Sequence, residues 1–284
     1  MRRQLFFFFV LDLLFVLAAA ILIIVLTTVF SHKAPDTMDM SLVEGSGDVV
    51  LLEVSQNKKW VTLSKHGTLW LGEDSESPAK TAWPCNVNKV SSLLTEVSKN
   101  VRVYKKADGV SEWKHFGVEE KDCLKLKVKQ DDKQAVSWLF SRDIRDTKGQ
   151  TAVFRTSKGQ TVWEAQSTIP SFLVYEADFW ADSHAIPSFA PSFAAIGENA
   201  AAINRGKLFC LTPASHLVPT TVQQASFTGG IEATFSVYKK GEEYVVRPTF
   251  SCPALPEFDL VNYGYIMDEG GVSQLLEVLE EIAR

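Results

Sequence analysis

Residue types that could do chemistry are present in this sequence, but few are spaced for it. Ser236 and Lys239 match the Ser-x-x-Lys pattern of penicillin-binding proteins, which requires its serine at the start of a helix. Here both residues lie in an alternating, strand-like run, and no Lys-Thr-Gly motif follows. The histidines are scattered, and none has HExxH spacing or stands beside a candidate nucleophile. They are His32, His66, His115, His184 and His216. We therefore expect no catalytic residue and a non-enzymatic protein, with a hydrolase as the least favoured alternative.

The cysteines show no metal-ligand spacing. They form no Cys-x-x-Cys pair and no Cys/His cluster, so zinc is not expected. Gly45-Ser46-Gly47 is too short to cradle a phosphate and no P-loop is present, so we expect no cofactor and no ATPase activity. An even number of cysteines in an exported domain permits two disulfides in three alternative pairings, and buried thiols are the competing interpretation. The cysteines are Cys85, Cys123, Cys210 and Cys252.

The tryptophans permit a sugar-stacking hypothesis. A glycan-binding surface would need two or three of them exposed on one face, with carboxylates or amides nearby. Most of them lie in strand-like runs, where large aromatic side chains build the core of a sheet, so core packing is the favoured interpretation. They are Trp60, Trp70, Trp83, Trp113, Trp138, Trp163 and Trp180.

The elements that position these residues begin with an apolar run at residues 5–30. It has 26 residues, of which 20 are Leu, Ile, Phe or Val, and its one charge is Asp12. As a helix it would reach about 39 Å, more than the ~30 Å hydrocarbon core of a bilayer. At about −0.4 kcal/mol each, the 20 apolar residues outweigh the roughly +3 kcal/mol cost of Asp12. The run therefore predicts a single transmembrane helix.

Charges at the two ends of this run predict its orientation. Arg2 and Arg3 precede it and only Lys33 follows it closely, so the positive-inside rule places the N-terminus in the cytoplasm. A cleaved secretory signal is the alternative, but the apolar run continues without a break past the candidate cleavage site. We expect a single-pass protein of the cytoplasmic (inner) membrane, with its C-terminal domain outside the cytoplasm. Asp12 either sits protonated or reaches toward the cytoplasmic interface, or else it makes a polar contact with another membrane helix.

The charge balance limits the partners of the exported part. The formal charge of −5 includes two arginines and one aspartate before residue 31, so residues 31–284 carry −6. Positive and negative residues are mixed throughout, without a long block of one sign. A mildly acidic region is a poor match for polyanions, so we expect no nucleic-acid partner.

Behind the predicted span, the pattern is that of an α+β protein built from antiparallel hairpins. Alternating apolar residues flank turn residues at 56–58, 157–159 and 239–241, which predicts three hairpins. Residues 124–129 alternate strictly, with leucine or valine on one face and lysine on the other. This is typical of a half-exposed antiparallel strand, whose lysines belong to a solvated sheet face or to a charged edge.

Two short helices complete the predicted fold. Residues 87–97 carry apolar side chains on one helical face, and either Asn86 or Asn88 can cap this helix. The last part of the chain, residues 272–282, repeats the same spacing. Because each helix follows a hairpin, a degenerate internal duplication is a further hypothesis, and the predicted fold class is α+β in two related halves.

These elements divide the chain into four predicted segments. They are a cytoplasmic N-terminus and transmembrane anchor at 1–33, a polar tether at 34–47, an α+β domain at 48–190 and a second α+β half at 191–284. The proposed boundary near residue 190 falls in a Pro/Phe-rich stretch in which Ile-Pro-Ser-Phe occurs twice. Its apolar side chains are either a partner-contact surface or interdomain packing. With Asp12, the candidate partner contacts are Pro170, Phe172, Pro187, Phe189, Pro191 and Phe193.

The order of several short motifs resembles the bacterial domain-of-unknown-function family 4340 over about residues 50–190. The motifs are Lys59-Trp60-Val61-Thr62-Leu63, the helix at 88–97, Phe116-Gly117-Val118, Ala152-Val153-Phe154-Arg155 and Val162-Trp163-Glu164. The sequence departs from the family at Ser141-Arg142, where a glycine is expected. Members are often encoded beside ABC-transporter components of the gliding-motility type, which implies an accessory role and supplies no catalytic residues.

The sequence therefore predicts a non-enzymatic, membrane-anchored extracytoplasmic accessory or scaffold subunit. Its expected partners are other membrane proteins, such as subunits of an ABC-type export or gliding-type complex. The alternative is an extracytoplasmic binding module for a cell-wall glycan or peptide.

Overall fold

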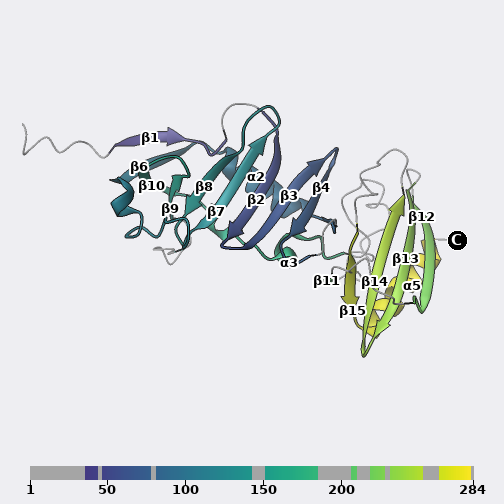
Figure 1. Cartoon of the computed structure of the whole chain (residues 1–284). Helices are drawn as coiled ribbons and strands as arrows, with labels where there is room; N and C mark the ends of the chain where they lie inside the picture. Colours follow the sequence, from purple (N-terminus) through teal and green to yellow (C-terminus); the bar gives the residue numbers. More distant parts are fainter. Residues whose placement is uncertain are drawn as a thin grey trace, which may run out of the picture. The chain divides into compact units, whose positions relative to one another are not determined.

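The computed structural model describes most of the chain behind the predicted span (Figure 1). The described residues are 36–43, 47–77, 81–142, 151–184, 206–209, 218–227, 231–251 and 262–282. They form mainly antiparallel β-structure with a few helices, which confirms the coarse α+β prediction. No helix in these ranges is long and apolar enough to cross a bilayer. The predicted span at 5–30 and Asp12 lie outside the described residues. The described residues from Asp39 onward belong to one compact unit.

One sheet has ten strands in the order β1-β6-β10-β9-β8-β7-β2-β3-β4-β5. Its strands are β1 (Thr37–Met40), β2 (Val49–Gln56), β3 (Lys59–His66), β4 (Leu69–Asp74), β5 (Trp83–Pro84), β6 (Val101–Asp108), β7 (Leu124–Gln130), β8 (Val136–Phe140), β9 (Thr151–Thr156) and β10 (Thr161–Gln166). The predicted hairpins around 56–58 and 157–159 are confirmed as β2–β3 and β9–β10. Asn57 turns the first of them in the left-handed region, at φ 55°, which asparagine tolerates better than most residues.

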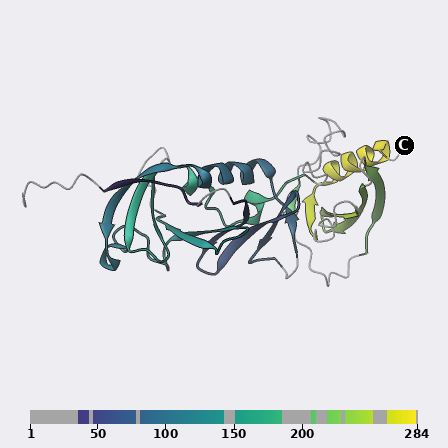
Figure 2. The same cartoon turned by 90° about the horizontal axis from the view of Figure 1, so that it is seen from above.

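One face of this sheet packs against helix α2 (Val87–Ser98), as Figure 2 shows. Val54 lies opposite both Val61 and Leu126, and all three are fully buried on this face. The helix begins where Asn86 Oδ1 accepts the amide N–H of Lys89 at 3.1 Å, so Asn86 is the cap.

The buried side of α2 consists of Val90, Leu93 and Val97, as predicted. Val87, which the sequence pattern placed with them, is 44% exposed. The prediction was wrong there because Val87 is the first residue of the helix and lies one turn before the part that meets the sheet.

The opposite face of the ten-stranded sheet is covered only in part. A loop at residues 109–123, which includes the short helix η1 (Val110–Glu112), lays Phe116 and Val118 on Val153 and Val162. Beyond this loop the face carries the β7 lysines. Because β7 pairs with β2 and β8 on its two sides, these lysines belong to a solvated sheet face and not to an edge strand.

The predicted tether at 34–47 is partly folded. It contains β1, and Leu42 is buried. The amide of Leu42 and the hydroxyl of Ser41 both donate to the carbonyl of Val97, at 3.2 and 3.1 Å. Trp138 Nε1 donates to the carbonyl of Leu42 at 3.3 Å, so this segment closes over the end of α2.

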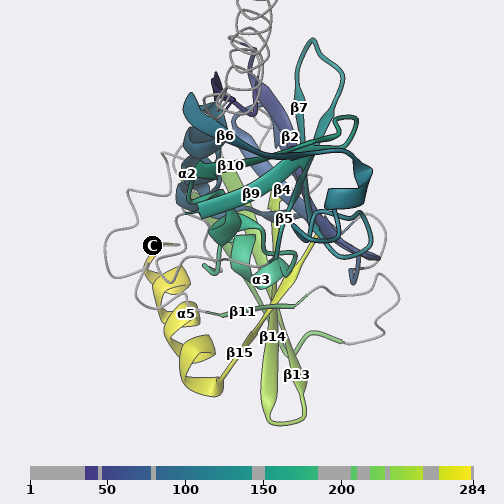
Figure 3. The ribbon, with the colours of Figure 1, turned by 90° about the vertical axis from the view of Figure 1, so that its left-hand side faces the viewer.

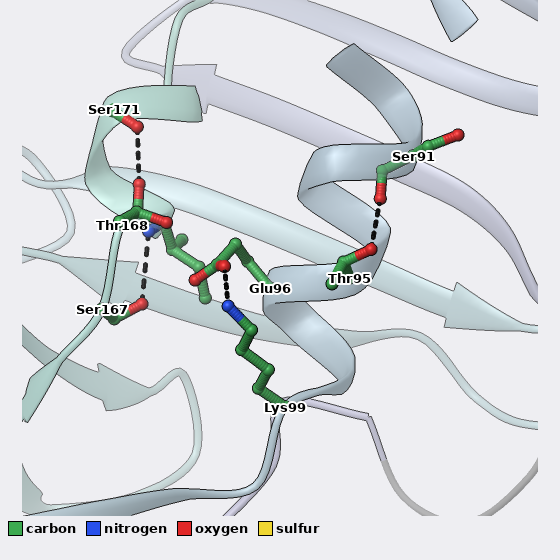
Figure 4. Close-up of polar contacts among 8 residues, drawn as sticks. Ser91, Thr95, Glu96, Lys99, Ser167, Thr168 and Ser171 are labelled. Carbon is green, nitrogen blue, oxygen red and sulfur yellow. Dashed lines mark hydrogen bonds and ion pairs between the residues drawn. The ribbon is translucent and has the colours of Figure 1, made fainter. Parts of the chain in front are cut away.

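The segment that follows β10 in the sequence also contacts α2, as Figure 4 shows. It forms the short helices η2 (Ile169–Phe172) and α3 (Ala177–Trp180). Burial raises the pKa of the Glu96 carboxyl, but hydrogen bonds from Lys99 and Thr168 outweigh it, so the net pKa is below the ordinary value. This carboxylate therefore joins α2 to the start of η2.

A second sheet has five strands in the order β11-β15-β14-β13-β12. Its strands are β11 (Lys207–Phe209), β12 (Thr221–Phe227), β13 (Ile231–Lys240), β14 (Glu243–Ser251) and β15 (Gly264–Met267). Figure 3 shows the long β13–β14 hairpin, which confirms the one predicted around 239–241. Helix α5 (Glu269–Ile282) contacts β12 and β14 and buries Val272, Leu275 and Leu279. These repeat the spacing of the buried residues in α2, while the duplication itself stays a prediction, as does the boundary near residue 190.

We predict that Gly72→Ala destabilises the fold by about 1–3 kcal/mol, because it overpacks the core. A Cβ at Gly72 would lie 2.1 to 2.5 Å from three ring atoms of Trp83, which is fully buried. Trp83 cannot move freely, since its Nε1 donates to Asp74 at 3.2 Å. Chemical denaturation measures the loss.

The matched control is Gly270→Ala in the first turn of α5. A Cβ there meets only one atom, at 3.7 Å, so alanine is expected to be neutral or to stabilise by up to ~1 kcal/mol. Equal losses for both substitutions would contradict the packing of Trp83 against β4.

Candidate ligand-binding groove

An open groove of about 530 Å³ lies on the solvated face of the ten-stranded sheet. This volume is within the ~300–1,000 Å³ range of small-ligand sites. Strands β2, β3, β7 and β8 and the 109–123 loop contribute its walls. The lining residues are Glu53, Ser55, Gln56, Asn57, Trp60, Glu120, Lys121, Cys123, Lys125 and Leu139.

Strand register brings most of these side chains together. Ser55 lies directly opposite Trp60 on β3 and Lys125 on β7, and Lys125 lies opposite Leu139 on β8. Directly opposed residues in an antiparallel sheet share a face, with Cβ atoms ~5 Å apart. The four side chains therefore form a continuous strip across four strands, and Leu139, which is buried, forms its apolar base.

The charges of the groove divide into paired and unpaired groups. Glu53 binds Lys127 at 3.0 Å, and Lys121 lies 3.4 Å from Glu119. Lys125 and Glu120 form no ion pair within the described ranges, and both line the groove. One cation and one anion are thus left to solvent or to a ligand.

Arg155 on β9 fixes the loop that forms one wall of the groove. This side chain is fully buried and donates from Nε to the carbonyl of Val118 at 2.9 Å. Its Nη1 donates to the carbonyls of Thr156 and Ser157 at 3.1 and 3.4 Å. The ring of Trp113 lies over the guanidinium, with its centroid 3.5 Å from Cζ. Nη2 has no hydrogen-bond partner in the described structure, and the cation–π contact offsets part of that cost.

Cys123 lines the groove and also interacts electrostatically with Arg155. Its thiol is buried and donates weakly to the carbonyl of Glu120, at 3.7 Å. Burial raises the pKa of the Cys123 thiol, and the charge of Arg155 opposes that rise. Burial in turn lowers the pKa of Arg155, while Cys123 and Glu120 favour its charged form. The guanidinium stays protonated because an arginine side chain is not deprotonated in proteins.

Two of the four cysteines lie in the described residues, and neither forms a disulfide there. Cys85 is a buried free thiol, as is Cys123, which agrees with the buried-thiol interpretation for these two. Burial raises the pKa of Cys85 well above its ordinary value, and Asp182 adds to the rise. Cys210 and Cys252 lie outside the described residues, so their redox state stays open.

All seven tryptophans lie in the described part of the chain, and none is fully exposed. Trp83, Trp138 and Trp180 are buried in the core, as the favoured interpretation predicted. The other four are half-buried, and of these only Trp60 lines the groove. The described faces therefore offer one aromatic side chain in this groove, and not the two or three that a glycan-binding surface would need.

The remaining chemical motifs lie away from the groove. Ser236 and Lys239 are both in β13, as expected, and an interval of three places them on opposite faces of a strand. His184 Nδ1 lies 2.5 Å from Asp182 Oδ1, and this hydrogen bond orients the imidazole. The sequence did not indicate this pair. No group of three or more metal-ligating side chains occurs in the residues that the structure describes.

Two of the candidate partner contacts lie in η2. Pro170 and Phe172 are half-buried, and the ring of Phe172 lies 6.4 Å from that of fully buried Trp180. Both rings lie within the predicted 48–190 domain, so this contact tests neither interdomain packing nor a partner surface, and the candidate contacts stay a prediction. The other candidates, Asp12, Pro187, Phe189, Pro191 and Phe193, lie outside the described residues.

Comparison with known proteins found no matching family model, no matching curated protein and no matching solved structure. The resemblance to family 4340 therefore stays a prediction.

We predict that Arg155→Met destabilises the fold by at least about 2 kcal/mol. The carbonyls of Val118, Thr156 and Ser157 would lose their charged donor, and hydrogen bonds to charged groups are worth ~1.5–3 kcal/mol each. Hydrogen exchange should accelerate most at residues 110–118. Arg155→Lys should give an intermediate effect, because lysine lacks the planar fork. Uniform acceleration across β2 and β3 would contradict the local role.

We predict that the thiol of Cys123 reacts with a maleimide or disulfide reagent more slowly than an unperturbed cysteine at pH 8. Its raised pKa keeps the thiolate, which is the reactive form, scarce until the pH rises further. Site-resolved mass spectrometry should show Cys85 slower still, because its pKa is raised well above the ordinary value. Arg155→Met should speed Cys123 labelling by opening the loop and leave Cys85 unchanged. Faster labelling of Cys85 than of Cys123 would contradict this account.

The raised thiol pKa values determine how the stability of the fold depends on pH. A thiol whose pKa is higher in the folded state stabilises the fold fully below its unfolded pKa of ~8.5, and this contribution is lost as pH rises through the folded pKa.

Proposed function

We propose that this protein is a non-enzymatic, membrane-anchored accessory subunit whose β-sheet region lies outside the cytoplasm. One observation carries the proposal, namely the 26-residue apolar run with paired arginines in front of it, followed by a folded α+β region. Such a run is long enough to span the bilayer. The arginines favour an exported C-terminal region.

The partner class comes from the sequence resemblance. Family 4340 members are often encoded beside ABC-transporter components of the gliding-motility type, so we propose that the partners are subunits of an ABC-type export or gliding-type complex. Asp12 supports a partner in the membrane, because an ionisable group within a span usually faces protein and not lipid.

The second candidate function is an extracytoplasmic binding module for a cell-wall glycan or peptide. The groove favours it, because Lys125, Glu120 and the indole N–H of Trp60 line one cavity and have no hydrogen-bond or ion-pair partner among the described residues. The two functions are compatible, since an accessory subunit can bind both its complex and a ligand.

We expect the full-length protein, extracted from its own membrane in a mild detergent, to co-purify with transporter subunits in a fixed ratio. Asp12→Asn should reduce this recovery several-fold, because it removes the one charge in the predicted span. Mass spectrometry of the purified fraction makes the measurement.

The matched control is Asp39→Asn, which removes an exposed carboxylate from β1 outside the predicted span. It should leave recovery unchanged. A full-length protein that is always recovered alone, or that remains in the soluble fraction, would contradict the accessory proposal.

A further inference from the structure

We infer that the groove binds short peptides that carry both a free carboxylate and a free amine. This inference deepens the binding-module candidate and rests on it. It depends on which groups of the groove are already bound within the protein and which are left for a ligand.

The unpaired charges of the groove have opposite signs. Glu53 and Lys121 are engaged by Lys127 and Glu119. Lys125 and Glu120 have no ion-pair partner in the described structure, although both line the same cavity. A ligand with one carboxylate and one ammonium group would neutralise both side chains at once, with the carboxylate on Lys125 and the ammonium on Glu120.

The remaining lining groups suit the middle of a peptide. The side chains of Ser55 and Asn57 and the indole N–H of Trp60 have no hydrogen-bond partners in the described ranges, so they are available to the carbonyl and amide groups of a peptide backbone. The half-buried ring of Trp60 and the buried side chain of Leu139 offer an apolar surface to a ligand side chain. A cavity of about 530 Å³ limits the ligand to a few residues.

Other ligand classes fit this set of groups less well. A polyanion would face two carboxylates, Glu53 and Glu120, in the same cavity. A neutral glycan would leave Lys125 and Glu120 without ion-pair partners and would find one aromatic ring for stacking. Only a zwitterionic ligand uses both unpaired charges.

Equilibrium dialysis of the detergent-solubilised full-length protein tests the inference. The probes are a random tripeptide pool with free termini, the same pool acetylated at the N-terminus or amidated at the C-terminus, and a pool of neutral cell-wall oligosaccharides. Mass spectrometry measures retention. We expect retention of free tripeptides and at least a tenfold loss with either capped pool, a result that needs no protein variant.

The variants locate the contacts. Lys125→Met should abolish the penalty for amidation, since the ligand carboxylate has then lost its partner, and Glu120→Gln should abolish the penalty for acetylation. Lys129→Met is the matched control, because Lys129 is an exposed lysine of the same strand that does not line the groove. It should retain free tripeptides as the wild type does.

Three results would overturn the inference. Equal retention of capped and free peptides would remove the role of the two charges. Retention of oligosaccharides but not peptides would overturn the peptide class and leave the binding module standing. Retention of neither would overturn the inference together with the binding-module candidate, while co-purification of transporter subunits would still support the accessory role.

Discussion

The buried guanidinium of Arg155 is the constraint on which the groove-bearing face of the ten-stranded sheet depends. A fully buried charge is costly unless its hydrogen bonds are satisfied, and here three backbone carbonyls and one indole ring supply the compensation. Two of those partners, Val118 and Trp113, belong to the 109–123 loop. The loop is therefore held on β9 and β10, and the groove has a fixed wall in place of a mobile segment.

The groove follows from the way that the two faces of the ten-stranded sheet differ. One face is mainly apolar and packs against α2 and the segments around it. The 109–123 loop covers the other face over β9 and β10 and leaves it open over β2, β3 and β7. The groove lies at the edge of the covered part. Cys123 and Glu120 lie at the end of the loop, and Lys125 lies just beyond on β7. Side chains at such an edge are exposed enough to meet a ligand and held firmly enough to orient it.

The sequence predicted the local elements well because their signals are local. Alternation and turn residues such as Asn57 and Gly241 fix hairpins, and the spacing of Val90, Leu93 and Val97 fixes a helix. The groove was not predicted, because Glu53, which lines it, and its partner Lys127 are 74 positions apart and meet only through the pairing of β2 with β7. One local signal was available, since Arg155 ends an apolar strand run, where a charge must be either exposed or specifically bound.

The role that we propose for the groove is to bind a peptide ligand outside the cytoplasm. The most direct measurement is photo-crosslinking in intact cells, with a photoreactive residue at position 121 on the rim of the groove and, as the comparison, at position 129 on the open face. The account predicts a peptide adduct from position 121 and none from position 129. Equal adducts from both positions, or cytosolic proteins as the captured species, would contradict it.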